Sequence, residues 1–303
     1  MAYEFRIGDD PGKGLKRIAR QQLRRLAEQL RDRADQANGH HEARKCIKRL
    51  RALMILARPA IGKAKWSGID GRHAKVARRL STARDTTVLL QTLDRLQKQH
   101  GAPALAGPGA RLREALRSEI ARPETEKLLA DIVDKLDRLA SRIKGMKLAH
   151  ADFAPAWSGL EGDYRGARQA LRQAYGDGKP DDFHLLRKHV QRHWRHMQLF
   201  ATAWPAEMVA RIALAKALSE LLGEDHDLTM LRLRLKDDGG AKALDRLCRE
   251  RQMQLRATAS GGLALLLAER PKALRRRLNV YWRAAVAAGK KRDDKALGID
   301  GGN

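Results

Sequence analysis

The chain has 303 residues, and its 62 lysines and arginines against 36 acidic residues give a formal net charge of +26. This excess is greater than solubility requires and indicates a polyanionic partner, such as nucleic acid, an anionic membrane or polyphosphate. Aromatic residues make up only 4% of the chain, which argues against a surface that stacks unpaired bases.

Neither the start of the sequence nor its cysteines indicate export or membrane insertion. The first ten residues, MAYEFRIGDD, lack the basic and apolar regions of a signal peptide, and the longest apolar run, 263–268, is too short to cross a bilayer. Cys46 and Cys248 make no disulfide framework. A cytoplasmic protein without membrane contact is therefore expected.

The predicted elements are helices along almost the whole chain, because apolar residues recur every three or four positions and β-branched runs are absent. Glycine and proline clusters, including Asn38-Gly39, Pro59 to Gly62 and Gly261-Gly262, separate them. The sequence predicts one domain over 12–287, preceded by a short extension (1–11) and followed by a disordered tail (288–303). The predicted helices lie at about 14–36, 41–57, 65–99, 110–121, 124–143, 152–175, 182–202, 206–235, 241–259, 262–268 and 271–287.

Two distant segments, HEARKCIKRLR (41–51) and HLLRKHVQRHWR (184–195), align residue by residue. Two later segments, LSTARDTTVL (80–89) and LGEDHDLTML (222–231), align at nearly the same offset, which places Asp85 on Asp227. We infer a duplicated helical unit with halves at about 12–145 and 150–287.

Each first segment predicts a helix with a basic side and an apolar side. At about 100° per residue, His41, Lys45 and Lys48 form one ridge, and Cys46 and Leu50 lie opposite. The flanks of this ridge are Arg44, Arg49 and Arg51. In the second copy the ridge is His184, Lys188, Gln191 and Arg195, with Arg187 and Arg192 beside it.

Neighbouring predicted helices add further positive charge. The additional candidates are Arg17, Arg20, Arg24, Lys75, Arg78, Arg79, Arg165 and Arg168. A solvated helix face is the ordinary explanation of such residues. Like charges at i and i+4, such as His41 and Lys45, cost stability, however, and a bound anion would relieve that cost.

The H-x-x-R-K-x-x-[KQ]-R pattern at 41–49 and 184–192, with ARD at 83–85 and DHD at 225–227, resembles the CHAD domain, the conserved histidine α-helical domain. The resemblance covers about residues 12–287. It implies two four-helix bundles, related by a pseudo-twofold axis, that enclose a basic central channel. It also implies binding of inorganic polyphosphate and association with polyphosphate granules.

The resemblance also suggests roles for individual residues. By motif, the ligand-facing side chains would be His41, Arg44, Lys45, Lys48 and Arg49 in the first half, and His184, Arg187, Lys188, Arg192 and Arg195 in the second. Gln191 stands where the first copy has Lys48, so the halves need not bind equally. Asp85 and Asp227 either hold basic residues in position or form ordinary intrahelical ion pairs.

The chain is expected to bind its ligand without a cofactor and without catalysis. Residues 3–8, YEFRIG, lack the Glu-x-Glu-x-Lys strand of the CYTH triphosphatase domain that accompanies many members of the family, so a stand-alone module is expected. A polyphosphate-processing enzyme is disfavoured by the lack of acidic metal ligands near the ridges. A nucleic-acid-binding protein is the main alternative, because the charge alone fits it.

Two expectations concern histidine. His189, His193 and His196 share one helix side and could bind a metal, but their first-copy counterparts are apolar, which favours part-buried packing histidines. If His41 and His184 face a bound polyanion, affinity should rise as the pH falls from about 8 to 6.

Overall fold

The computed structural model of the chain describes residues 3–31, 36–62, 67–68, 70–71, 82–101, 107–120, 126–146, 153–236 and 242–296. These residues contain helices and no strand, which confirms the all-α prediction. The helices are α1 (Pro11–Arg31), α2 (Gln36–Ile61), α4 (Thr82–His100), α5 (Pro108–Ile120), α6 (Glu126–Gly145), α7 (Ala154–Asp177), α8 (Pro180–Leu199), the short η2 (Ala201–Ala203), α9 (Pro205–Lys236), α10 (Lys242–Leu266) and α11 (Pro271–Ala296).

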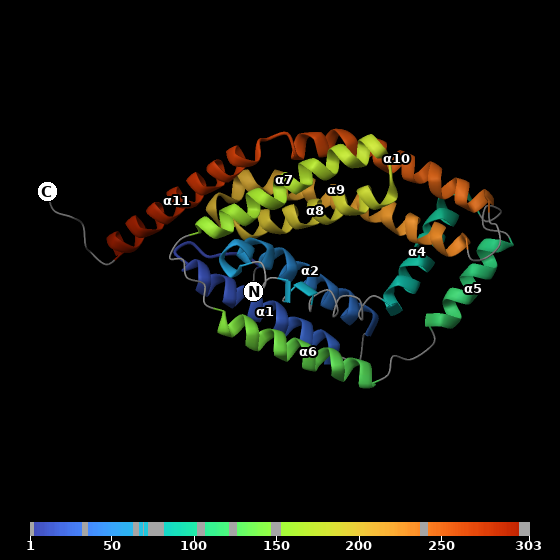
Figure 1. Ribbon diagram of the computed structural model, residues 1–303, viewed down its shortest axis with the longest axis horizontal. Coiled ribbons are helices and arrows are strands. Elements are labelled where there is room, and N and C mark those ends of the chain that lie inside the picture. The colour runs from blue at the N-terminus through green and yellow to red at the C-terminus, as the bar shows by residue number, and fades with distance from the viewer. Residues whose placement is uncertain are drawn as a thin grey trace.

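The helices form an elongated layered arrangement (Figure 1). Helix α1 lies between α2 and α6 on one side of the molecule, and α7, α8, α9, α10 and α11 form the other side. Helix α2 packs against both α7 and α8, so it joins the two sides. Helices α4 and α5 lie at one end, beside the distal parts of α9 and α10 (Figure 1).

Burial of one side of each helix follows the apolar periodicity of the sequence. In α1, Leu15, Ile18 and Leu26 are buried, while Arg20 and Arg24 are exposed. The apolar side predicted for α2 is buried in the same way, because the side chains of Cys46, Leu50, Leu53 and Met54 all lie in the core. Removing these stripes from water is the main force that assembles the helices.

The buried residues form two clusters. The larger cluster joins α1, α2 and α6 to α7, α8 and α11, and includes Leu53, Leu160 and Val190. The smaller cluster joins α4 and α5 to α9 and α10, and includes Leu93 and Leu231. Each cluster therefore draws residues from both of the halves inferred from the sequence.

Several helix boundaries differ from the sequence prediction. Helix α2 runs through Gly39 and Pro59 and ends before Gly62, whose left-handed φ of 82° is typical of a residue that follows a helix. Helix α10 continues through Gly261 and Gly262, where a Cβ on Gly262 would lie 3.1 Å from Leu218 Cδ2 of α9. The glycine thus permits close packing of two helices instead of breaking one.

The two ends of the chain also differ from expectation. Helix α11 continues to Ala296, so residues 289–296 are helical and the prediction of a disordered tail is wrong there, while 297–303 lie outside the described residues. Strong helix formers such as Lys290 and Lys291 account for the extension. At the other end, Phe5 is 1% exposed, and its backbone N–H donates to the carbonyl of Leu199 at 2.9 Å. The predicted extension therefore packs into the core.

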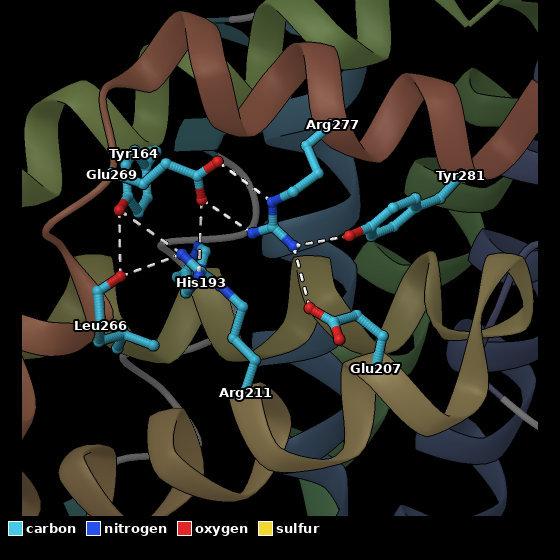
Figure 2. A network of polar contacts seen from close by, with 8 residues as sticks. All are labelled: Tyr164, His193, Glu207, Arg211, Leu266, Glu269, Arg277 and Tyr281. Carbon is cyan, nitrogen blue, oxygen red and sulfur yellow. Dashed lines mark hydrogen bonds and ion pairs between the residues drawn. The ribbon is translucent and has the colours of Figure 1, made fainter.

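A polar network ties the C-terminal helices together (Figure 2). Arg211 of α9 donates through Nη2 to the carbonyl of Leu266 at the end of α10 (3.0 Å) and through Nε to His193 Nε2 of α8 (3.1 Å). Arg277 of α11 donates through Nη2 to Glu269 Oε2 (2.8 Å), just before that helix begins. These bonds satisfy an orphan carbonyl of α10 and fix α11 against the body.

Within the described part of the chain, no helix carries an apolar stretch of the length that a bilayer crossing requires.

Candidate anion-binding face between α2 and α8

The basic sides of α2 and α8 are turned toward each other. Burial is the main cause of the lowered pKa of Lys188 of α8, and the charge of Arg51 of α2 is the second cause. Burial also lowers the pKa of Arg187, and Arg44 of α2 adds to this effect while Asp227 opposes it. Cations from two helices therefore lie close enough to disfavour each other's charge. We call the side chains of Arg44, Lys48, Arg51, His184, Arg187 and Lys188 the α2–α8 face.

A stacked histidine pair borders this face. The ring of His184 lies 4.1 Å from that of His226 of α9, centroid to centroid. Burial, followed by Lys188 and Arg187, lowers the pKa of His184 to about 4. Burial, followed by Arg187 and His184, lowers that of His226 to about 3, and Lys48 of α2 contributes as well. Both rings are therefore neutral at pH 7.

Two buried polar atoms of this face have no hydrogen-bond partner among the described residues: Nδ1 of His184 and Nε of Arg187. The Arg187 side chain lies across Gly223 of α9, where an added Cβ would be 3.8 Å from Nε. Buried polar groups are normally paired, so the Nε–H donor of Arg187 is suited to an external acceptor, whereas Nδ1 of neutral His184 donates or accepts according to its tautomer.

Carboxylates pair with cations on the face and beside it. Lys45 Nζ lies 2.6 Å from Glu42 Oε1, and Arg51 Nη2 lies 3.2 Å from Asp70 Oδ1. Asp227 pairs with Arg95 of α4, with 3.6 Å between Oδ2 and Nη2. This contact joins α4 to α9, so Asp227 takes part in an interhelical ion pair while it also favours the charged form of Arg187.

Arg192 belongs to a cluster next to the face. Its Nε donates to Asp163 Oδ1 of α7 at 2.8 Å, and His189 Nδ1 lies 3.0 Å from the same oxygen. Burial alone would raise the pKa of Asp163, but the hydrogen bond with His189 and the charge of Arg192 hold it well below its ordinary value. A cavity opens beside this cluster, with Arg51 and Arg58 of α2 in its wall.

Arg195 differs most from the sequence-based expectation, because its side chain is turned inward instead of standing on the ridge. The residue is 4% exposed, with its guanidinium 3.6 Å from the Trp194 ring centroid and Nη1 donating to Gln198 Oε1 at 2.8 Å. Burial and then Arg49 lower its pKa to about 10. The hydroxyl of Tyr3 donates to the carbonyl of Arg49, so the N-terminal segment covers this region.

The other predicted basic residues have separate surroundings. Arg17 pairs with Asp9 (2.6 Å) and Arg165 with Glu161, whereas Arg20 and Arg24 are exposed. His41, Arg168 and Gln191 are partly buried. The residues Lys75, Arg78, Arg79 and the side chain of Asp85 lie outside the described residues.

The three histidines considered as metal ligands each contact the protein. His196 Nε2 donates to the carbonyl of Ala52 on α2 (2.9 Å), His193 accepts from Arg211, and His189 contacts Asp163. Among the residues that the structure describes, no group of three potential ligand side chains is placed to hold a metal ion.

Sequence reasoning missed two features of the site: Arg58, which lines the cavity, and the stacking of His226 on His184. Arg58 continues the row Arg44, Lys48, Arg51 along one side of α2, and this spacing is visible in the sequence. The stacking depends on how α8 packs against α9, which no local pattern reveals.

A family model described as the CHAD domain matches residues 17–236, which is well over half of the chain and includes both α2 and α8. The match ends with α9, so α10 and α11 lie beyond it. No curated protein matches the chain. The family match and the paired basic helices agree with the motif at 41–49 and 184–192, and the chain belongs to the CHAD domain family.

Proposed function

We propose that the chain binds inorganic polyphosphate on the α2–α8 face, without catalysis. The observation that carries the proposal is that cations of two helices lie close to each other. The charge of Arg44 contributes to the lowered pKa of Arg187, and the charge of Arg51 contributes to the lowered pKa of Lys188. Gathering like charges in a partly buried place is unfavourable in the free protein. A polyanion placed between the helices would offset that cost.

The chemistry of the face suits this ligand. Polyphosphate is a flexible thread with a negative charge on every internal unit and no base to read. Guanidinium groups such as those of Arg44 and Arg187 can bind phosphate oxygens in a bidentate way, and Lys48 and Lys188 supply mobile point charges. Binding of this kind depends on charge and shape alone.

Binding is proposed in preference to hydrolysis because three carboxylates near the face are each paired with an arginine. Asp163 pairs with Arg192 (2.8 Å), Asp225 with Arg256 (2.7 Å), and Asp227 with Arg95 (3.6 Å). Carboxylates held by arginines are poor ligands for the metal ions on which phosphoryl transfer depends.

The finer features implied by the CHAD resemblance belong to the same proposal. They are a duplicated architecture in which α2 and α8 are equivalent helices of two bundle-like halves, a cytoplasmic location, and association with polyphosphate granules. The mutual placement of α2 and α8 supports the first of these.

Nucleic-acid binding is the second candidate, favoured by the net charge of +26. A protein that recognises double-stranded DNA commonly inserts a protruding helix into a groove of the duplex. Helix α8 instead packs against α2, α7 and α9, and part of its basic side is buried. This burial favours a thin, flexible polyanion over a duplex.

The proposal is tested by the affinity for labelled long-chain polyphosphate in fluorescence anisotropy at fixed salt. The double variant Lys48→Gln, Lys188→Gln removes one cation from each helix and should raise Kd by about 10-fold or more. The double variant Lys272→Gln, Arg276→Gln removes the same charge from exposed positions of α11 and should change Kd by less than about 2-fold. Equal effects of the two variants would contradict a localised site.

A further inference from the structure

A cavity of about 620 Å³ lies between the end of α2, the start of α7 and the middle of α8. Its wall includes the basic side chains Arg51, Arg58 and Arg192, together with Gly162 of α7. This volume falls within the range of pockets that hold small organic ligands, so it has room for more than a single ion.

The cavity is continuous with the α2–α8 face along α2. Arg44, Lys48, Arg51 and Arg58 follow one side of the helix, and at 1.5 Å per residue this row is about 21 Å long. Arg51 belongs to both places, because it lines the cavity and also lowers the pKa of Lys188 on the face. A polyphosphate chain that binds along this row of basic residues would reach the cavity.

The charge of the cavity favours an anion although two carboxylates are present. Asp70 accepts from Arg51, and Asp163 is held by Arg192 and His189. Arg58 is exposed, and no carboxylate in the described part of the chain pairs with it. Three guanidinium groups against two carboxylates leave the wall positive, next to the cations of the face.

The side of the cavity at α7 is closed by backbone. At Gly159, which lines the cavity, α7 approaches α2 so closely that an added Cβ would lie 2.7 Å from the carbonyl oxygen of Ile55. A phosphate chain that enters from the α2–α8 face therefore cannot continue between α2 and α7. A chain that reaches this wall has to end or turn back there.

We propose that this cavity binds the terminal phosphate units of the polyphosphate chain whose interior lies on the α2–α8 face. The inference rests on the proposed function and adds an end-recognition site to it. A terminal phosphate carries one more ionisable oxygen than an internal unit, which suits a pocket with several guanidinium groups. The protein would thereby distinguish free chain ends from chain interior.

Gly162 provides a direct test, because a Cβ at this position meets no atom within 4 Å although the residue lines the cavity. The side chain of Gly162→Leu should occupy part of the cavity and obstruct access to its wall, and leucine favours a helix more than glycine does. Gly176→Leu is the matched control, since Gly176 lies on the same helix, also faces open space, and is outside the cavity wall. Circular dichroism should show that both variants are folded.

Binding is measured with tripolyphosphate, with long polyphosphate, and with the same long chains capped at both ends as phosphoramidates. Tripolyphosphate consists mostly of chain ends, so Gly162→Leu should raise the Kd for tripolyphosphate by about 10-fold or more. The same variant should raise the Kd for uncapped long chains by about 2- to 5-fold. Capped chains should bind wild type and Gly162→Leu equally. Gly176→Leu should match wild type with every probe.

The outcomes separate this inference from the proposed function. If Gly162→Leu binds tripolyphosphate and uncapped chains as wild type does, end recognition is wrong while polyphosphate binding stands. If wild type binds neither capped nor uncapped chains, both are wrong. If orthophosphate displaces tripolyphosphate at equal concentration, the cavity is a site for free phosphate, and end recognition is overturned.

Discussion

The imidazole rings of His184 in α8 and His226 in α9 stack with 4.1 Å between their centroids and 24° between their planes. Burial and the cations Arg187, Lys188 and Lys48 disfavour protonation of the pair, and Asp181 only partly opposes this for His184. Both imidazoles are thus neutral at pH 7 in the free protein. This state determines how both stability and binding respond to acid.

The first prediction concerns stability. An unfolded histidine titrates near 6.5, whereas the folded pKa values of His184 and His226 are about 4 and about 3. Below pH 6.5 the unfolded chain therefore binds protons that the folded protein does not, and stability falls as the pH drops toward 4. The double variant His184→Gln, His226→Gln should lose less stability over this window than wild type, by on the order of 1–3 kcal/mol.

Urea unfolding of wild type and this variant at pH 7 and pH 5 measures the difference. His193 and His196 are buried with lowered pKa values as well, so wild type and variant share their contribution. Parallel pH dependence in the two proteins would contradict the assignment to the stacked pair.

The second prediction concerns affinity. If His184 titrated near its ordinary value, polyphosphate binding would strengthen from pH 8 to 6, as the sequence suggested. Because burial and neighbouring cations hold its pKa at about 4, we expect little change over that range from this residue. A bound polyanion favours imidazolium, so affinity should rise below about pH 6.

Calorimetry at fixed salt between pH 8 and 4.5 tests this expectation, with His184→Gln, His226→Gln as the comparison. The variant should show a flatter profile below pH 6 and nearly wild-type affinity at pH 8. A wild-type rise confined to pH 8–6 that the variant abolishes would show that the pair titrates at ordinary pKa values.

The third prediction concerns the number of cations that contact the ligand. Each cation that neutralises a phosphate releases counterions, so Lys188→Gln and Lys48→Gln should each lower the slope of log Kd against log salt by about 0.7–0.9. Arg276→Gln on α11 should leave the slope unchanged. An unchanged slope for Lys188→Gln would mean that this lysine does not touch the ligand.

The fourth prediction concerns Asp227, which pairs with Arg95 and lies near Arg187. Asp227→Asn should lower the free energy of unfolding by about 0.5–1 kcal/mol, because a partly exposed ion pair is lost. It should also strengthen polyphosphate binding, since a negative charge is removed beside the face. Weaker binding would instead show that Asp227 orients a ligand-binding cation.

The fifth prediction separates the scaffold from the site. Arg211 joins α9 to the end of α10 and to His193 (Figure 2), so Arg211→Met should lower stability by about 2–4 kcal/mol through the unpaired groups that it leaves behind. Polyphosphate affinity at 15 °C, where the variant is folded, should stay within about 2-fold of wild type. A larger loss of affinity would connect this network to the site.

Much of the fold could be predicted from the sequence, because apolar periodicity alone indicates most of the helices. The breaks at Gly39 and Gly261 were wrong, since tertiary packing supports a helix through a glycine when a neighbouring helix needs close approach, as at Gly262. Helical wheels likewise placed Lys48 and Lys188 on basic sides. They could not reveal the inward turn of Arg195, which is 4% exposed and lies near Tyr3 of the distant N-terminal segment.

The most direct test of polyphosphate binding is a competition for labelled long-chain polyphosphate, with unlabelled polyphosphate and duplex DNA of equal total charge as competitors at the same salt. We expect polyphosphate to displace the label at a concentration at least about 10-fold lower than DNA requires, because the cations lie between two packed helices and not on a protruding one. Displacement by DNA at an equal or lower concentration would contradict the proposed function and favour a nucleic-acid-binding protein.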